Sequence, residues 1–328
     1  MYGARVPTAA HDPRLAARVI ARRRLRYRGG ADAALDRPAH VRSASGLARW
    51  RGGVAVVSDD ASFVGLVDVA TGLCAPITLP AGAGGVRQFE DRRGNKAGKL
   101  DLESLFADGD RLIALGSDSG LAVRRHAIVI EARGDVRAVA IPRLYAALRR
   151  PALGRGALNL EGATVLGDDV VLGNRGGDVG DDGLATIDAF ARVPRAALRA
   201  LLADPDGAPV PAIAWTPLAL GALANVALRL TELEAIGDRL FFAATAEATT
   251  SAYDDGAVAG SVIGVIDGDE RAAGAVPRWA VVVDEHGAPL VAKLEGLAAD
   301  GAHLVASVDA DDPDAASELL ALELRGPW

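Results

Sequence analysis

Four glutamates recur at the same point of a short apolar phrase. They are Glu103 in D-L-E-S-L, Glu161 in N-L-E-G-A, Glu234 in E-L-E-A-I and Glu295 in K-L-E-G-L. A weaker fifth copy, A-S-G-L-A, has Ser45 at that point. Carboxylates gathered by a repeat are the oxygen ligands that Ca²⁺ and Mg²⁺ prefer. They can instead accept hydrogen bonds from backbone N–H groups of a neighbouring repeat, so a metal role and a structural role both stay open.

The glutamates belong to repeating units of roughly 60 residues. In each unit, the Leu-Glu strand precedes a turn rich in Gly and Asp and a second apolar strand, a pattern typical of a β-hairpin. Further strand-like runs bring the total to about four strands per unit, as in a propeller blade. The units start near residues 44, 101, 159, 232 and 293. We therefore predict an all-β, five-bladed β-propeller that forms one domain over residues 1–328. A six-bladed propeller is the alternative, because the third unit and the N-terminal segment are long.

The two ends of the chain are predicted to complete one blade together. The last unit shows only three strand-like runs before the chain ends. The N-terminal run I-A-R-R-R-L-R-Y-R, residues 20–28, is expected to supply the fourth strand and to leave no open sheet edge. Residues 143–150 and 193–204 break the β pattern with helix-forming residues at helical spacing, which predicts two short helices.

Polar residues surround the Leu-Glu strands in the sequence. In a propeller, the start of the innermost strand and the end of the next strand lie at the same face, so these side chains are expected to converge on one funnel. The predicted substrate-binding residues are Lys96, Lys99, Asp118, Asn174, Arg175 and Asp309. No catalytic residue is assigned from the sequence.

The charge of a glutamate ring needs compensation. Four carboxylates ~8 Å apart repel one another by ~2 kcal/mol per pair at an effective dielectric constant of 20. At least one of three arrangements should therefore hold: a cation binds, nearby Lys and Arg side chains pair with the ring, or some carboxyl groups are protonated. Without Cys or His clusters, the expected cation is Ca²⁺ or Mg²⁺ rather than zinc.

The repeated phrase resembles known propellers. Leu-Glu-Gly followed by Gly-Asp and an apolar strand is similar to the F-E-G-L phrase of the esterase-like or phytase-like propellers, and N-K-A-G-K-L-D-L-E looks like an uncharacterised bacterial branch of that group. The phrase is distantly similar to the calcium-dependent lactonases of the gluconolactonase and regucalcin type. That resemblance implies metal ligands at Glu103, Glu161, Glu234 and Glu295. It also implies that Asn174 and Asp309 stand in for the Asn and Asp ligands of that family.

The composition limits the partners of the protein. The net charge of −7 excludes nucleic acid as the main partner, because such sites need a basic surface. The single cysteine excludes an internal disulfide. No apolar run approaches a membrane span or the core of a signal peptide, so we expect a cytoplasmic protein without a membrane partner. The oligomeric state is not predicted.

These observations together predict a Ca²⁺-dependent hydrolase of a small anionic substrate, such as a phosphoester or a lactone. The site is expected at the mouth of the central channel, where the metal would polarise the substrate and activate a water. The alternative is a non-catalytic propeller that binds a small ligand or a protein at the same face.

Overall fold

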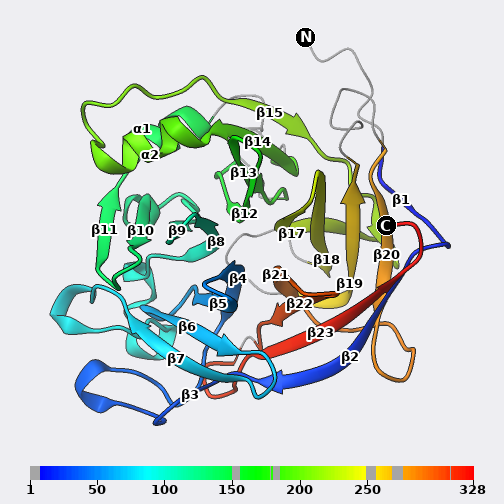
Figure 1. Cartoon of the computed structure of the whole chain (residues 1–328), viewed down its shortest axis with the longest axis horizontal. Helices are drawn as coiled ribbons and strands as arrows, with labels where there is room; N and C mark the ends of the chain where they lie inside the picture. The colour runs from blue at the N-terminus through cyan, green and yellow to red at the C-terminus, as the bar shows by residue number, and fades with distance from the viewer. Residues whose placement is uncertain are drawn as a thin grey trace.

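The computed structural model describes residues 8–149, 156–177, 179, 185–248, 256–267, 276–310 and 312–328. Its sheets stand around a common centre in chain order, in a propeller-like arrangement (Figure 1). Strands β4, β8, β12, β17 and β21 lie nearest the centre, and β7, β11, β15, β20 and β2 lie at the periphery. The fold is therefore mainly β, as predicted.

The first three sheets each contain four consecutive antiparallel strands. The first comprises β4 (Ala44–Trp50), β5 (Gly53–Ser58), β6 (Phe63–Asp68) and β7 (Leu73–Thr78), with the short β3 (Arg26–Tyr27) at its outer edge. The second comprises β8 (Leu102–Asp108), β9 (Arg111–Gly116), β10 (His126–Ile130) and β11 (Val136–Ala140). The third comprises β12 (Leu160–Leu166), β13 (Asp169–Asn174), β14 (Ala189–Pro194) and β15 (Ala214–Pro217).

The last two units share one continuous sheet. One unit comprises β17 (Val226–Ile236), β18 (Arg239–Ala248), β19 (Ala257–Ile266) and β20 (Arg278–Val283), with β1 (Ala10–His11) and β16 (Ala222–Leu223) beside it. The other comprises β21 (Leu294–Asp300), β22 (His303–Val308), β23 (Glu318–Arg325) and β2 (Ala16–Arg24). A short parallel pairing of β2 with β20 joins the two units at their outer edges.

The N-terminal strand completes the last unit. Strand β2 pairs antiparallel with β23 from Ala16–Arg325 to Arg24–Glu318. The prediction that an N-terminal segment supplies the missing strand is confirmed, although the strand begins four residues earlier than the predicted run. Val19 is fully buried against the core of this unit, whereas Ile20 is 44% exposed.

Tight hairpins connect the first two strands of each unit. In β8–β9, Asp108 pairs with Arg111, which leaves the two-residue turn Gly109-Asp110. Gly109 has φ +64°, a left-handed conformation that favours glycine. The Gly-Asp phrases seen in the sequence therefore mark these turns, as predicted.

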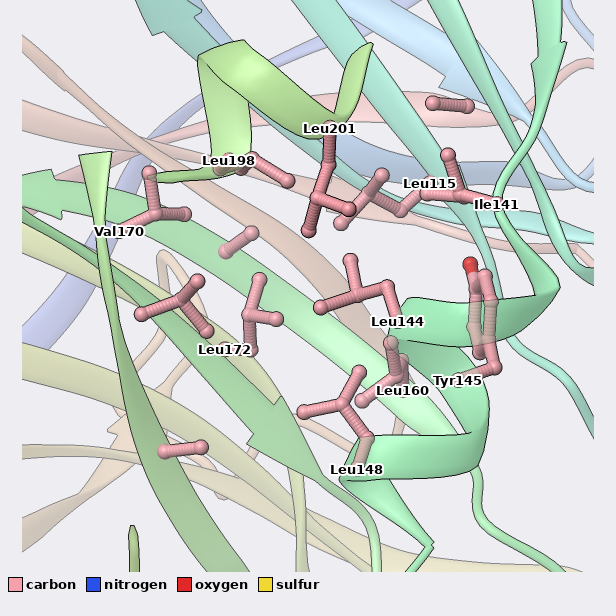
Figure 2. Close-up of a cluster of buried hydrophobic side chains, with 14 of the residues drawn as sticks. Leu115, Ile141, Leu144, Tyr145, Leu148, Leu160, Val170, Leu172, Leu198 and Leu201 are labelled. Carbon is pink, nitrogen blue, oxygen red and sulfur yellow. The ribbon is translucent and has the colours of Figure 1, made fainter. Parts of the chain in front are cut away.

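Two short helices cover the outer part of the second and third units. Helix α1 spans Pro142–Leu148 and α2 spans Arg195–Ala203, which confirms both predicted helices. Leu198 and Leu201 of α2 face Val170 and Leu172 of β13, and α1 packs beside them in the same apolar cluster (Figure 2). No helix in the described part of the chain is long and apolar enough to span a membrane. Among the described residues, five single-turn 3-10 helices lie in loops: η1 (Ala33–Leu35), η2 (Ala83–Gly85), η3 (Asp91–Arg93), η4 (Lys96–Gly98) and η5 (Ala122–Arg124).

The inner strands approach one another closely around the centre. Each contacts the inner strand of the next unit, including β21 with β4. Small residues permit this approach: a side chain on Gly46 would meet the backbone of Leu105, and one on Gly296 would meet the carbonyl oxygen of Ser45. The glycines of the L-E-G phrase therefore serve the packing of neighbouring units.

Candidate functional site

A β-bulge aims the predicted glutamates at one end of the centre. The pairing register slips between Leu102 and Ser104, so Glu103 is the extra residue of β8. In β21 the register shifts at Glu295 in the same way, and in β12 the shifted segment includes Glu161. Bulges redirect a side chain out of the regular alternation. The three glutamates line one cavity of about 400 Å³.

Glu234 lies elsewhere, which corrects the sequence alignment of the fourth unit. In β17 the register slips between Leu230 and Glu232, so Thr231 occupies the bulge. Glu234 is three residues further along, where its Oε1 accepts a hydrogen bond from the backbone N–H of Ala299 in β21, at 2.9 Å. It links two neighbouring units and does not line the cavity. The paired leucines of L-T-E-L, which match L-E-S-L, were the sequence signal for the correct register.

The predicted substrate-binding residues divide into two groups. The cavity is lined by Lys96, Lys99, Arg175 and Asp309, as well as by residues that the sequence did not single out. The latter include Arg42, Asp59, Asp101, Arg124, Asn159 and Lys293. Asp118 and Asn174 are not part of the lining.

Asp118 and Asn174 make local contacts outside the cavity lining. The buried Asp118 carboxylate pairs with Arg125 at 2.8 Å and with Arg149, and its φ is +76°. Asn174 accepts a hydrogen bond from the backbone N–H of Asn159 at 3.0 Å and donates one to the carbonyl oxygen of Ile187 at 2.8 Å. The polar groups of both side chains are therefore engaged in contacts within the protein.

Three carboxylates from two units form an acidic cluster in the cavity. Ligand oxygens of Asp59, Asp101 and Glu103 lie within 4.8 Å of one another. Asp59 follows β5, and the other two lie at the start of β8. The Lys99 ammonium lies 2.5 Å from Asp59 Oδ2 and 2.6 Å from Asp101 Oδ1. Arg124 contributes a second cation, 2.7 Å from the other oxygen of Asp101.

The charges around this cluster shift its protonation. Burial alone would raise the pKa of Asp101, but Lys99 and Arg124 outweigh it and hold that pKa below its usual range. Glu103 behaves in the opposite way. Burial, and then the negative charges of Asp59 and Asp101, raise the pKa of Glu103 well above its usual value. The Glu103 carboxyl makes no hydrogen bond or ion pair with any residue that the structure describes.

Glu161 has a different environment from Glu103. Its Oε1 accepts hydrogen bonds from Asn159 Nδ2 at 2.7 Å and from Arg175 at 3.2 Å. Arg175 also pairs with Glu247 of the next unit, at 2.5 Å. Burial raises the pKa of Glu161 to about 8 against the opposing effect of Arg175. The third glutamate, Glu295, pairs with Lys293 at 2.8 Å.

Hydroxyl groups connect the acidic cluster to Glu161. Ser117 donates to Asp101, and its oxygen lies 2.6 Å from the Ser119 oxygen. Ser119 in turn lies 3.0 Å from Asn159 Oδ1, and Asn159 contacts Glu161. The floor of the cavity is therefore a continuous polar network between the second and third units.

Glu232 closes the centre below this network. It stands where other units have Gly or Ser, and its carboxyl accepts hydrogen bonds from the backbone N–H groups of Ala163 at 3.1 Å, Leu233 at 2.9 Å and Leu47 at 3.4 Å. These residues belong to three inner strands, β4, β12 and β17, and the units of β4 and β12 are separated by the unit of β8. Glu232 therefore bridges the centre, and burial raises its pKa well above the usual value.

A family model matches residues 40–324 of the chain and is described as a family of unknown function, DUF6929. The chain belongs to this family. The match covers all five inner strands, so the predicted uncharacterised propeller-like family is confirmed at that level. The more specific resemblance to phytase-like or lactonase propellers stays a prediction. No curated protein matches this DUF6929 chain.

Solved structures similar to this DUF6929 protein have low sequence identity to it. Glutaminyl cyclase from Myxococcus xanthus is 11% identical, with a TM-score of 0.50, over 98% of this chain and 100% of that one. A glycosyl hydrolase from Bacteroides ovatus is 8% identical, with a TM-score of 0.46, over 88% of this chain and 86% of that one. At such identities the likeness concerns the fold alone.

Proposed function

We propose that the cavity is a hydrolytic site for a small substrate with an anionic group, a phosphoester or a lactone, and that Glu103 is its proton donor. The observation that carries this proposal is the Glu103 carboxyl itself. It faces a polar cavity without a hydrogen-bond partner among the described residues, and burial together with the charges of Asp59 and Asp101 raises its pKa well above the usual value. A general acid needs a proton to give and room for the leaving group.

The cluster also contains an acceptor for the second proton. Asp59 Oδ2 receives Lys99, whereas Asp59 Oδ1 is a buried atom without a hydrogen-bond partner in the described structure, so the attacking water must enter beside it. In the proposed reaction, a water attacks the phosphorus or the carbonyl carbon and gives a proton to Asp59. The bond to the leaving oxygen breaks, and that oxygen takes the proton of Glu103.

Cations at the rim support an anionic substrate. Arg92 and Lys96 line the cavity with side chains that are 61% and 41% exposed. Their partners include Asp91 and Asp314, which are also exposed. Exposed ion pairs contribute little free energy, so a substrate anion can replace these partners at small cost.

We propose that residues 1–328 fold as a single domain, a closed five-bladed propeller. The pairing of β2 with β23 and the contact of β21 with β4 support closure. The cytoplasmic location stays a prediction.

The predicted calcium ion does not suit the described residues as they stand. A calcium site needs six to eight oxygen ligands. Lys99 already contacts two carboxylates of the acidic cluster, Glu161 is bound by Arg175, and Glu295 is bound by Lys293. Of the three arrangements that could compensate the glutamates, pairing with cations and protonation are the ones supported here. No step of the proposed reaction uses a metal.

A substrate panel tests this proposal. Wild type, Glu103→Gln and the control Glu131→Gln, on the outer part of the second unit, are assayed with phosphoesters and lactones. We expect Glu103→Gln to lower kcat at least about 100-fold, because general acid catalysis contributes 10²–10⁴-fold, and Glu131→Gln to keep the wild-type rate.

Two results would contradict the proposal. Turnover that survives Glu103→Gln would show that another group is the acid. Saturable ligand binding without turnover would favour the alternative, a non-catalytic binding propeller. The extensive charge pairing inside the cavity is also compatible with that alternative.

A further inference from the structure

The acidic cluster of Asp59, Asp101 and Glu103 already contains a cation. The Lys99 ammonium lies 2.5 Å and 2.6 Å from oxygens of Asp59 and Asp101. Calcium binds carboxylate oxygens at about 2.3–2.6 Å. The ammonium therefore stands where a divalent ion shared by these two carboxylates would stand.

The position of Lys99 is built by the fold. Its side chain is 10% exposed and follows the single turn η4, which brings it to the start of β8. Asp59 reaches it from the end of β5 in the preceding unit. A buried ammonium needs such partners, because removal of charge from water is unfavourable without compensation.

A second buried cation completes the local balance. Arg124 is 3% exposed and pairs with Asp101 Oδ2 at 2.7 Å. Lys99 and Arg124 together match the two negative charges of Asp59 and Asp101. A divalent ion added to this cluster would meet the repulsion of both cations and would compete with Lys99 for the same oxygens.

We infer that Lys99 is the permanent counter-cation of this cluster and takes the place of a divalent metal. Other carboxylates of the cavity also have tethered cations beside them: Arg175 pairs with Glu161, and Lys293 pairs with Glu295. The ammonium is held by Asp59 and Asp101, which are not the glutamates that the repeat pointed to as metal ligands. The inference concerns the cation and holds whatever reaction the cavity performs.

Calcium titration of variants tests this inference. Wild type, Lys99→Met and the rim control Lys96→Met are titrated with CaCl₂ by calorimetry, and their melting temperatures are measured with CaCl₂ and with EDTA. We expect Lys99→Met to bind one Ca²⁺ with a Kd of about 0.1–1 mM, in the range of weak protein sites, and to gain several degrees of Tm from calcium. Wild type and Lys96→Met should give no saturable heat.

Each other outcome overturns the inference. A wild-type protein that binds one Ca²⁺ in this range would have a resident metal despite Lys99. A folded Lys99→Met protein that does not respond to calcium would show that Lys99 only forms a structural ion pair.

A second variant decides the case in which Lys99→Met fails to fold even with calcium. Lys99→Met/Asp59→Asn removes one positive and one negative charge and so keeps the charge balance of the cluster. If Lys99 is the counter-cation, this double variant should fold and should not bind calcium. If this double variant is also unfolded, charge balance is not the role of Lys99. These experiments measure calcium binding and melting temperature, not activity. Their results therefore test the role of Lys99 even if the protein hydrolyses none of the proposed substrates.

Discussion

Neighbouring groups give equivalent glutamates different properties. Glu103 and Glu161 occupy bulges of adjacent inner strands, yet Arg175 and Asn159 bind Glu161, whereas Glu103 has no such partner in the described structure. The sequence phrase around them is nearly the same. Their separate roles follow from residues of other strands, which the phrase does not contain.

Glu161 is expected to make the stability of the protein depend on pH. Its pKa is about 8 in the folded protein against 4.5 for an ordinary glutamate. Between these values the folded state binds more protons than the unfolded state, so stability falls as pH rises. Wild type should therefore lose on the order of 1–3 kcal/mol more unfolding free energy than Glu161→Gln between about pH 5 and 8.

Urea unfolding at several pH values in that window measures this effect. Glu131→Gln serves as the control, because Glu131 lies away from the cavity and should leave the slope unchanged. Equal slopes for wild type and Glu161→Gln would show that Glu161 does not hold its proton in the folded protein.

At the level of strands, the sequence predicted the order of the elements better than their exact register. Gly-Asp turns and apolar runs marked the hairpins, and both helices were found within a few residues. The E-L-E phrase misaligned β17, because Glu232 and Glu234 both follow the pattern while Thr231 occupies the bulge. The pairing of Leu230 with Ala244 and of Glu232 with Ala243 shows that Thr231 is the extra residue, in agreement with the leucine spacing of L-T-E-L.

Glu232 is expected to be the strongest single link between the inner strands. Glu232→Ala would leave the backbone N–H groups of Leu47 and Ala163 without their acceptor, at a cost of about 2–4 kcal/mol in unfolding free energy. Glu232→Gln keeps an oxygen at that place and should cost clearly less. Chemical denaturation compares the two, and an Ala variant as stable as the Gln variant would contradict the bridging role.

For the whole molecule, the repeat predicted the propeller-like fold and the use of an N-terminal strand. It could not predict the contact between Asp59 and Lys99, because these residues come from different units and meet only where the two units pack together. The same holds for Arg175 and Glu247. Repetition within a sequence reports the shared scaffold, whereas contacts between units depend on the residues in which the units differ.

The N-terminal strand should be essential to the integrity of the fold. Val19→Asp places a charge in the core of the last unit and should lower stability by more than about 3 kcal/mol, whereas Ile20→Asp on the exposed face should change it by about 0.5 kcal/mol or less. Thermal and urea unfolding measure both. Similar stabilities for the two variants would mean that β2 is not held in the sheet in solution.

Glu103 is expected to carry a proton in the cavity at neutral pH. Infrared difference spectra of wild type against Glu103→Gln test it most directly, because a protonated carboxyl has a carbonyl stretch that a carboxylate lacks. We expect a protonated-carboxyl band at pH 7 that is absent from Glu103→Gln. A spectrum in which that variant instead removes a carboxylate band at pH 7 would contradict it.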